Sequence, residues 1–164
     1  MKFIGNFKEW IQPDWIEYIM NNPGMERPGK SENPNTEEFQ KATVSGYDLS
    51  KTYWHSYDTR CCPLDIKLPF KTNTVEQWWF IKMMPGNFMP MHRDVFLPER
   101  KNYTRYWMPL QDYNDGHIFI YDKLFINSYK AGDMWVYDDP NILHGACNIG
   151  YTPRLTFQCS TYEV

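Results

Sequence analysis

Residues 131–158 read AGDMWVYDDPNILHGACNIGYTPRLTFQ, and this stretch contains short apolar runs separated by turn-forming residues. The runs cover 133–137, 143–148 and the segment from 154 to 161. The breaks between them contain Pro, Gly, Asn and Asp, which favour turns over strands. Short proline-free runs bounded in this way predict three consecutive β-strands.

The same alternation of apolar runs and turns begins further upstream. Runs at 75–84, 103–110, 117–122 and 125–129 are interrupted by turn sequences such as Pro-Gly-Asn and Asn-Asp-Gly. Many short strands at close intervals are typical of a sandwich or a barrel-like jelly roll. Aromatic residues make up 18% of the chain. They favour a β-rich core over a helical bundle, because flat rings pack well on pleated surfaces.

The N-terminal part has a different pattern. Apolar side chains between positions 10 and 20 recur at helical spacing, and Pro13 can open a helix there. Residues 21–38 are rich in Pro, Gly, Asn and charge, which predicts a loop. Asn35 and Glu38 have the spacing of a capping box, so a short second helix is expected after them.

The length and composition limit the architecture and the possible partners. A chain of 164 residues has room for one hydrophobic core, so we expect a single domain over 1–164. Its parts are a helical N-terminal segment at 1–42, with the loop at 21–38, and a β core at 75–161. No apolar run is long enough for a transmembrane helix or resembles a secretory signal. The net charge of −3 argues against nucleic acid as a partner.

The four cysteines do not form the pattern of a disulfide framework. Cys61 and Cys62 are adjacent, and Cys147 and Cys159 lie far downstream without a C-x-x-C pair. Free thiols are typical of a reducing compartment, so we expect a cytoplasmic protein that contacts no membrane.

Histidine is scarce, and one of the four histidines belongs to the triplet His92-Arg93-Asp94. In an extended backbone residues i and i+2 point to the same face, so His92 and Asp94 can converge on one point. Both side chains bind metals, and His144 at the start of a predicted strand is the best candidate for a third ligand. Two histidines and one carboxylate on one face leave three coordination positions open, as in non-haem Fe(II) oxygenases. Alone, the His-x-Asp pair would be more typical of a surface ion pair.

An arginine lies ten residues after His144. A hairpin centred on residue 149 would place His144 opposite Arg154, and we expect such a hairpin between these strands. A buried arginine beside a metal needs an anionic partner, and a carboxylate suits its planar fork. Together these residues predict a metal with an oxyacid held beside it.

These motifs resemble the 2-oxoglutarate/Fe(II)-dependent dioxygenases. Within that superfamily the chain is most similar to the aspartyl/asparaginyl β-hydroxylase-like group, which includes bacterial proline hydroxylases. The matching stretches are MPMHRD (89–94), RYWMPL (105–110) and residues 131–158, in about the last half of the chain. The metal carboxylate Asp94 favours the proline-hydroxylase branch. Nucleic-acid demethylases of the superfamily carry a second arginine where this chain has Ser160.

The resemblance implies a fold, cofactors and residue roles. The fold is mainly β, a double-stranded β-helix (a cupin-like jelly roll) with one or two N-terminal helices. His92, Asp94 and His144 would hold Fe(II) as the catalytic centre. Arg154 would bind the distal carboxylate of 2-oxoglutarate, and Arg105 in RYWMPL would help to hold this cosubstrate. With O2 as the oxidant, 2-oxoglutarate would be converted to succinate and carbon dioxide while a C–H bond is hydroxylated.

The expected substrate is a small molecule, a peptide or a protein, hydroxylated on an amino-acid side chain, and the protein is expected to be a monomer or a homodimer. Three alternatives stay open: the same chemistry on another metabolite, a non-catalytic cupin-like binding module, and a lectin-like jelly roll that binds sugars. The last would explain the tryptophan content but not the His92, Asp94 and His144 set. Apolar lining of the site is expected from some of Trp78, Trp79, Phe88, Trp107 and Trp135.

Overall fold

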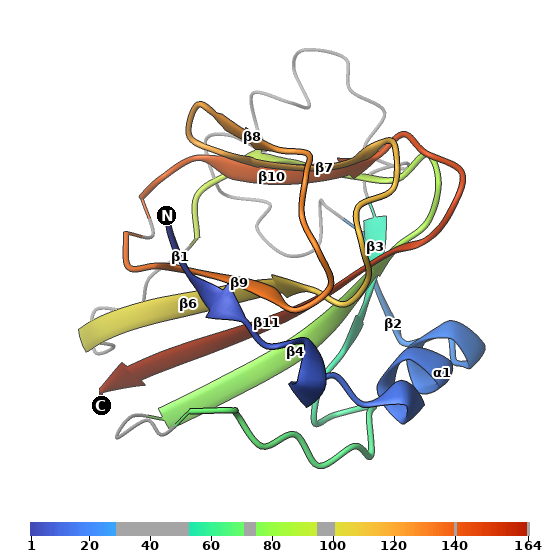
Figure 1. The fold of residues 1–164 in the computed structure, drawn as a ribbon, viewed down its shortest axis with the longest axis horizontal. Coiled ribbons are helices and arrows are strands. Elements are labelled where there is room, and N and C mark those ends of the chain that lie inside the picture. Colours follow the sequence, from blue (N-terminus) through green and yellow to red (C-terminus); the bar gives the residue numbers. More distant parts are fainter. Residues whose placement is uncertain (29–52, 71–74, 95–100, 140, 164) are drawn as a thin grey trace.

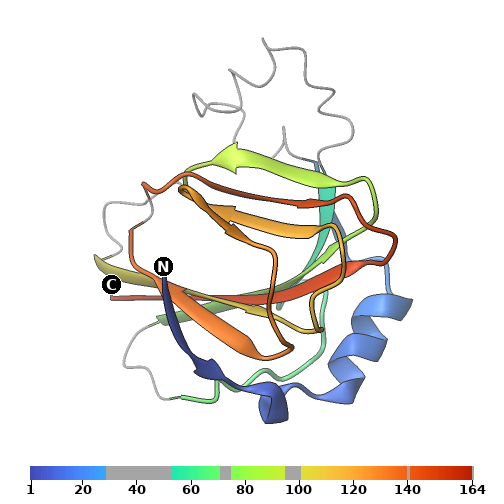
Figure 2. The same cartoon turned by 45° about the horizontal axis from the view of Figure 1, so that its top comes forward.

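A computed structural model describes residues 1–28, 53–70, 75–94, 101–139 and 141–163. The strands are β1 (Lys2–Asn6), β2 (Met25–Pro28), β3 (Tyr53–Tyr57), β4 (Val75–Met83), β5 (Phe88–His92), β6 (Lys101–Pro109), β7 (His117–Tyr121), β8 (Leu124–Ile126), β9 (Asp133–Tyr137), β10 (His144–Asn148) and β11 (Arg154–Glu163). They form two antiparallel sheets that face each other (Figures 1 and 2). The large sheet has the order β1-β9-β6-β11-β4-β3-β2, and the small sheet has the order β5-β10-β7-β8.

The connections between the sheets define a jelly roll. From β4 onward the chain passes from the large sheet to the small sheet and back, and only β7 and β8 stay together as a hairpin within the small sheet. This gives two interleaved four-stranded layers, β9-β6-β11-β4 and β5-β10-β7-β8. The predicted fold class, a mainly β double-stranded β-helix with an N-terminal helix, is therefore confirmed.

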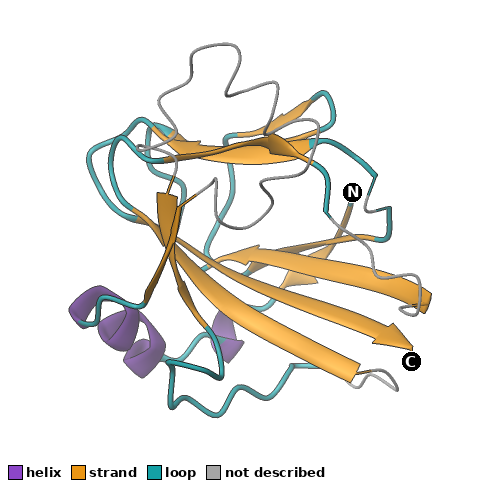
Figure 3. Cartoon of the chain, turned by 180° about the vertical axis from the view of Figure 1, so that it is seen from behind, coloured by secondary structure: helices purple, strands orange, loops and turns teal. Residues whose placement is uncertain are grey.

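The N-terminal helix covers the outer face of the large sheet. Helix α1 (Pro13–Asn21) has proline at its first position, where the missing N–H costs nothing, and a short 3-10 turn (Lys8–Trp10) precedes it. Trp15 and Ile19 of α1 are buried against the face of the sheet that points away from the small sheet (Figure 3). No helix in the described segments is long and apolar enough to cross a membrane.

One buried cation and one hydroxyl from the large sheet bind the end of this helix. The Lys82 ammonium donates to the carbonyl oxygens of Ile19 (2.6 Å) and Asn22 (2.9 Å). The Tyr57 hydroxyl lies 3.0 and 2.7 Å from the same two oxygens. Burial lowers the pKa of Lys82. These contacts satisfy carbonyls that a helix C-terminus leaves without partners, and they fix α1 on the sheet.

Strand β11 separates two hydrophobic clusters by the alternation of its side chains. Leu155, Phe157 and Cys159 face the outer cluster under α1, whereas the inner cluster between the sheets contains Trp107 of β6 and Phe119 of β7. Because successive side chains of a strand point to opposite faces, the even-numbered residues of β11 point toward the small sheet. The two faces of one strand thus have different surroundings.

Some sequence predictions for the first half were wrong. Residues 2–6 and 25–28, expected in a helical segment and a loop, form strands β1 and β2 at the two edges of the large sheet. No strand was predicted for β3 or β5 either. These short strands are defined by pairing with distant strands, β1 with β9 for example, and the local sequence carries little of that information. The second helix expected near Asn35 and Glu38 lies outside the described residues.

Candidate metal centre

The structure brings together the three predicted metal ligands. His92 ends β5, His144 begins β10, and the two residues are paired across the small sheet with ring centroids 4.4 Å apart. Asp94 lies two residues beyond β5, and its Oδ1 is 3.6 Å from Nε2 of His144. One ligand atom from each of the three side chains lies within 4.8 Å of the other two. This spacing fits a single metal ion.

The hydrogen bonds of the two histidines fix their tautomers for metal binding. Nδ1 of His92 donates to the Pro90 carbonyl at 2.8 Å, and Nδ1 of His144 donates to the Ile142 carbonyl at 3.0 Å. A carbonyl oxygen accepts only, so each Nδ1 carries a proton, and Nε2 is the ring nitrogen that can bind a metal. Metal-binding histidines typically have such a second partner, which orients the ring. The donor set therefore fits a divalent transition metal such as Fe(II).

The electrostatics favour the protonation states that metal binding needs. Burial, and then the neighbouring His92 ring, lower the pKa of His144 to about 4, so this imidazole is neutral at pH 7. Burial opposes the charge on Asp94, but Arg105 and the two histidines together lower the pKa of its carboxyl. The site therefore presents a neutral imidazole on His144 and a carboxylate on Asp94.

Arg105, the predicted second cosubstrate contact, lies on β6 beside Asp94. Its Nη1 forms an ion pair with Oδ2 of Asp94 at 2.7 Å, and both side chains are 14% exposed. The guanidinium carbon lies 4.9 Å from the centre of the Trp79 ring. A contact between Arg105 and a cosubstrate stays a prediction.

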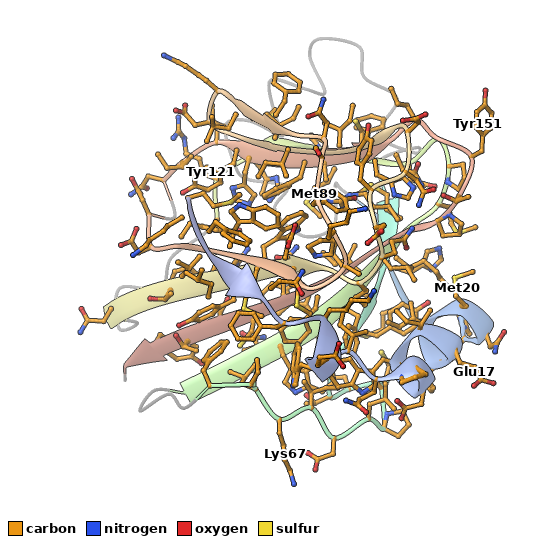
Figure 4. The ribbon with its side chains drawn as sticks, in the orientation of Figure 1. Glu17, Met20, Lys67, Met89, Tyr121 and Tyr151 are labelled. Atoms are coloured by element: carbon orange, nitrogen blue, oxygen red, sulfur yellow. The ribbon has the colours of Figure 1, made fainter. Side chains whose placement is uncertain are left out.

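All five predicted site residues line one cavity of about 250 Å³ between the two sheets. Met89 of β5 lies between the sheets in Figure 4 and also lines this cavity. Of the five aromatic residues expected as lining, Trp79 and Trp107 contribute to it, whereas Trp78 packs against the outer cluster. Strand alternation explains this difference between neighbouring tryptophans.

Arg154 occupies a part of this cavity where polar groups lack partners. Its residue exposure is 2%, and its Nε and Nη2 have no hydrogen-bond partner among the described residues. The Thr156 hydroxyl, on the same face of β11, and the Tyr129 hydroxyl are likewise buried without a partner there. Burial lowers the pKa of Arg154, and the nearby Tyr129 opposes this shift. The two unpartnered nitrogens of this buried guanidinium match the oxygens of a carboxylate.

The hairpin predicted between His144 and Arg154 was wrong. Strand β10 pairs with β5 and β7 in the small sheet, and β11 pairs with β4 and β6 in the large sheet. His144 and Arg154 therefore reach the cavity from opposite walls. Strands joined by a short connection often pair, but in a jelly roll they change sheets.

Three buried polar residues of β11 were missed in the sequence, and one of them, Gln158, lines the cavity. Thr156, Gln158 and Ser160 follow Arg154 at every second position of β11, and all are at most 9% exposed. Gln158 lines the cavity, and in the strand register it lies between Trp79 and Trp107. Its side-chain amide has no hydrogen-bond partner among the described residues. The signal is present in RLTFQCS, where polar and apolar residues alternate. In a buried strand such alternation indicates a polar inner face.

One of the two histidines outside the cluster, His117, has a structural partner. His117 at the start of β7 is fully buried, and its Nε2 donates to the Thr152 carbonyl at 2.8 Å. Burial lowers the pKa of His117. All four cysteines are free thiols.

No protein-family model matches the chain, and no curated protein matches it. Among solved structures, the chain is similar to the Cupin_2 domain of an XRE-family transcriptional regulator from Enterobacter cloacae (9% identity, TM-score 0.47), with 68% of this chain and 98% of that chain covered. It is similar to the cupin domain of Schizosaccharomyces pombe Cnp3 (13% identity, TM-score 0.43), with 72% and 74% covered. For a predicted oxalate decarboxylase from Thermotoga maritima the values are 17% and 0.39, and 52% of this chain matches 65% of that chain, which is less than two thirds of its length. These similarities are partial, so the assignment of a jelly roll rests on the strand order of the two sheets.

Proposed function

We propose that the protein is a non-haem iron oxygenase that couples the conversion of 2-oxoglutarate to succinate with hydroxylation of an amino-acid, peptide or protein side chain. One observation carries the proposal. The same cavity holds a two-histidine, one-carboxylate cluster and a buried arginine with unpartnered donors. A metal centre alone explains the first group but not the second. Together they match a metal and a dicarboxylic cosubstrate.

Each part of the site has a separate task in this proposal. His92, Asp94 and His144 would hold Fe(II), a metal that suits two imidazoles and one carboxylate. When bound there, Fe(II) supplies the oxygen activation that the reaction needs. The chain itself binds, orients and shields the reactants.

Arg154 would bind the distal carboxylate of 2-oxoglutarate, with the Tyr129 and Thr156 hydroxyls as further donors. A carboxylate there would give partners to groups that have none in the described structure. The Arg154 guanidinium carbon lies 5.7 Å from the centre of the Trp107 ring, and Trp107 stacks on Phe119 at 4.7 Å with an angle of 12°. These rings would exclude water from the part of the cavity between Arg154 and the metal ligands.

The substrate is proposed from the resemblance of residues 89–94, 105–110 and 131–158 to amino-acid and protein hydroxylases. Gln77, Asp58 and Arg60 add polar and charged groups to the cavity wall, where Asp58 and Arg60 form an ion pair with each other. The same chemistry on another small metabolite is the second candidate, because the cavity volume of about 250 Å³ suits small ligands.

An anaerobic titration tests the proposal. Adding Fe(II) and then 2-oxoglutarate should produce the weak visible charge-transfer band of the chelate, and His92→Ala should abolish it. Arg154→Met should weaken 2-oxoglutarate binding while metal binding is retained. Metal binding without any band or succinate formation would instead support a non-catalytic cupin-like module. Succinate release across a panel of free amino acids and peptides would then identify the substrate class.

A further inference from the structure

We propose that Arg105 is a positioning residue that orients the metal carboxylate of Asp94 so that only one of its oxygens faces the metal. This inference rests on the metal site of the proposed function, but it does not depend on the cosubstrate. It assigns to Arg105 a task that acts through Asp94.

The two oxygens of Asp94 have different neighbours. Oδ2 forms the 2.7 Å ion pair with Nη1 of Arg105, whereas Oδ1 lies 3.6 Å from Nε2 of His144. A carboxylate held in this way offers Oδ1 to a metal between the histidines and keeps Oδ2 on the arginine. Binding through one oxygen occupies one coordination position rather than two. Three positions of an octahedral ion then stay available to other ligands.

Arg105 is itself held firmly enough for this task. Its Nε donates to the Ser160 hydroxyl at 3.3 Å, and that oxygen is 3.0 Å from the Tyr103 hydroxyl. The guanidinium carbon lies 4.9 Å from the centre of the Trp79 ring and 5.5 Å from that of Tyr103. The arginine therefore belongs to a rigid group on the large sheet.

Asp94 needs such a support more than the other two ligands do. His92 and His144 are paired strand residues, and each ring is bonded to a backbone carbonyl. Asp94 lies beyond the end of β5 and outside the strand pairing. The contact with Arg105 ties this residue, which follows the small sheet, to the large sheet across the cavity.

A positioning role and a purely electrostatic role of Arg105 predict opposite changes in metal affinity when the arginine is removed. A guanidinium near a dication repels it, so removing an arginine that acts only by charge should tighten metal binding. Removing an arginine that orients a ligand should weaken metal binding, by about 10- to 100-fold for partners of metal ligands. The direction of the change therefore distinguishes the two roles.

The experiment is a Co(II) titration of the metal-free full chain. Calorimetry measures the affinity, and the visible absorption of the bound ion reports its coordination. Arg105→Met should weaken Co(II) binding by about 10- to 100-fold and change the spectrum, because the coordination changes. Arg105→Lys keeps the charge, and its Co(II) affinity should lie between those of Arg105→Met and the wild type. Ser160→Ala loosens the same arginine and should give a smaller loss in the same direction, which keeps the test valid if Arg105→Met does not fold. Lys130→Met removes a cation from the exposed pair with Asp112 (3.1 Å) and should leave affinity unchanged.

Equal or tighter Co(II) binding by Arg105→Met, or by Ser160→Ala if Arg105→Met does not fold, would overturn this role. Unchanged Co(II) affinity combined with weaker 2-oxoglutarate binding would overturn it in favour of a cosubstrate contact. If the wild type binds no Co(II), the metal site and the proposed function fail as well.

Discussion

Replacing Arg154 with Met should stabilise the ligand-free protein while removing its affinity for 2-oxoglutarate. The guanidinium is 2% exposed, and two of its three nitrogens have no hydrogen-bond partner among the described residues. Each buried donor without a partner costs about 1–3 kcal/mol. Methionine fills much of the same volume and needs no partner.

The gain is reduced by the favourable contacts that the arginine makes. The cation over the Trp107 ring, at 5.7 Å, contributes up to about 2 kcal/mol when it is desolvated. Water that enters the cavity satisfies part of the remaining demand. We therefore expect Arg154→Met to raise the free energy of unfolding by about 1–3 kcal/mol, which is roughly 3–9 °C in Tm for a chain of this size.

Lys82→Met is the matched control, because Lys82 is also a buried cation. Its ammonium has two carbonyl partners, at 2.6 and 2.9 Å, so its removal should lower the free energy of unfolding by about 2–4 kcal/mol. Both substitutions replace a buried cation with methionine, and the expected changes in the free energy of unfolding have opposite signs. The expected signs differ because the Lys82 ammonium has hydrogen-bond acceptors, whereas two nitrogens of Arg154 have none among the described residues.

The assay is chemical denaturation of metal-free protein, repeated with Co(II) and 2-oxoglutarate. At a cosubstrate concentration 100 times its Kd the wild type should gain about 2.7 kcal/mol, and Arg154→Met should gain only what the metal alone gives. The reasoning would be refuted if Arg154→Met were destabilised as much as Lys82→Met. Arg154 would then be a structural cation and not an open anion site.

Further predictions concern pH, a glycine contact and the two faces of β11. Because burial lowers the pKa of His117, the unfolded chain binds more protons than the folded chain below about pH 6.5, so stability should fall as the pH drops through that window. His117→Gln should reduce this dependence, to which His144 also contributes, in denaturation midpoints measured from pH 7 to pH 5. A Cβ on Gly116 would lie 2.2 Å from the Gly150 nitrogen at a φ of +92°, so Gly116→Ala should cost more than about 2 kcal/mol in thermal unfolding. Phe157→Ala should cost about 3–5 kcal/mol, whereas Gln158→Ala should change the unfolding free energy by less than about 1 kcal/mol; equal losses would contradict the assignment of the two faces.

The core strands could be predicted from the sequence because their signals are local. Strands β4, β6, β9 and β11 are apolar runs bounded by Pro or Gly turns, and their predicted bounds lie within two residues of the observed ones. Strand β5, which contains Pro90, and the edge strands β1 and β2 depend on partners far away in the chain. No local pattern contains that information.

The candidate site was predictable in composition but not in arrangement. The i, i+2 relation of His92 and Asp94 follows from extended backbone, and the ten-residue spacing identifies Arg154. The change of sheet between β10 and β11 is a property of the whole topology, so the pairing argument placed Arg154 on the wrong wall. The ion pair of Arg105 with Asp94 joins two sheets, and only the folded chain reveals it.

The alternation along β11 has a consequence for how this protein can be altered. Its outward side chains, Leu155 and Phe157, fill the cluster under α1, and its inward side chains, Thr156 and Gln158, lie in the wall toward the small sheet. Selection for a new substrate can therefore draw on the inward positions with little loss of folding. A mutant library restricted to those positions should contain a far larger fraction of folded variants than one restricted to the outward positions, which makes β11 a natural place to redesign specificity.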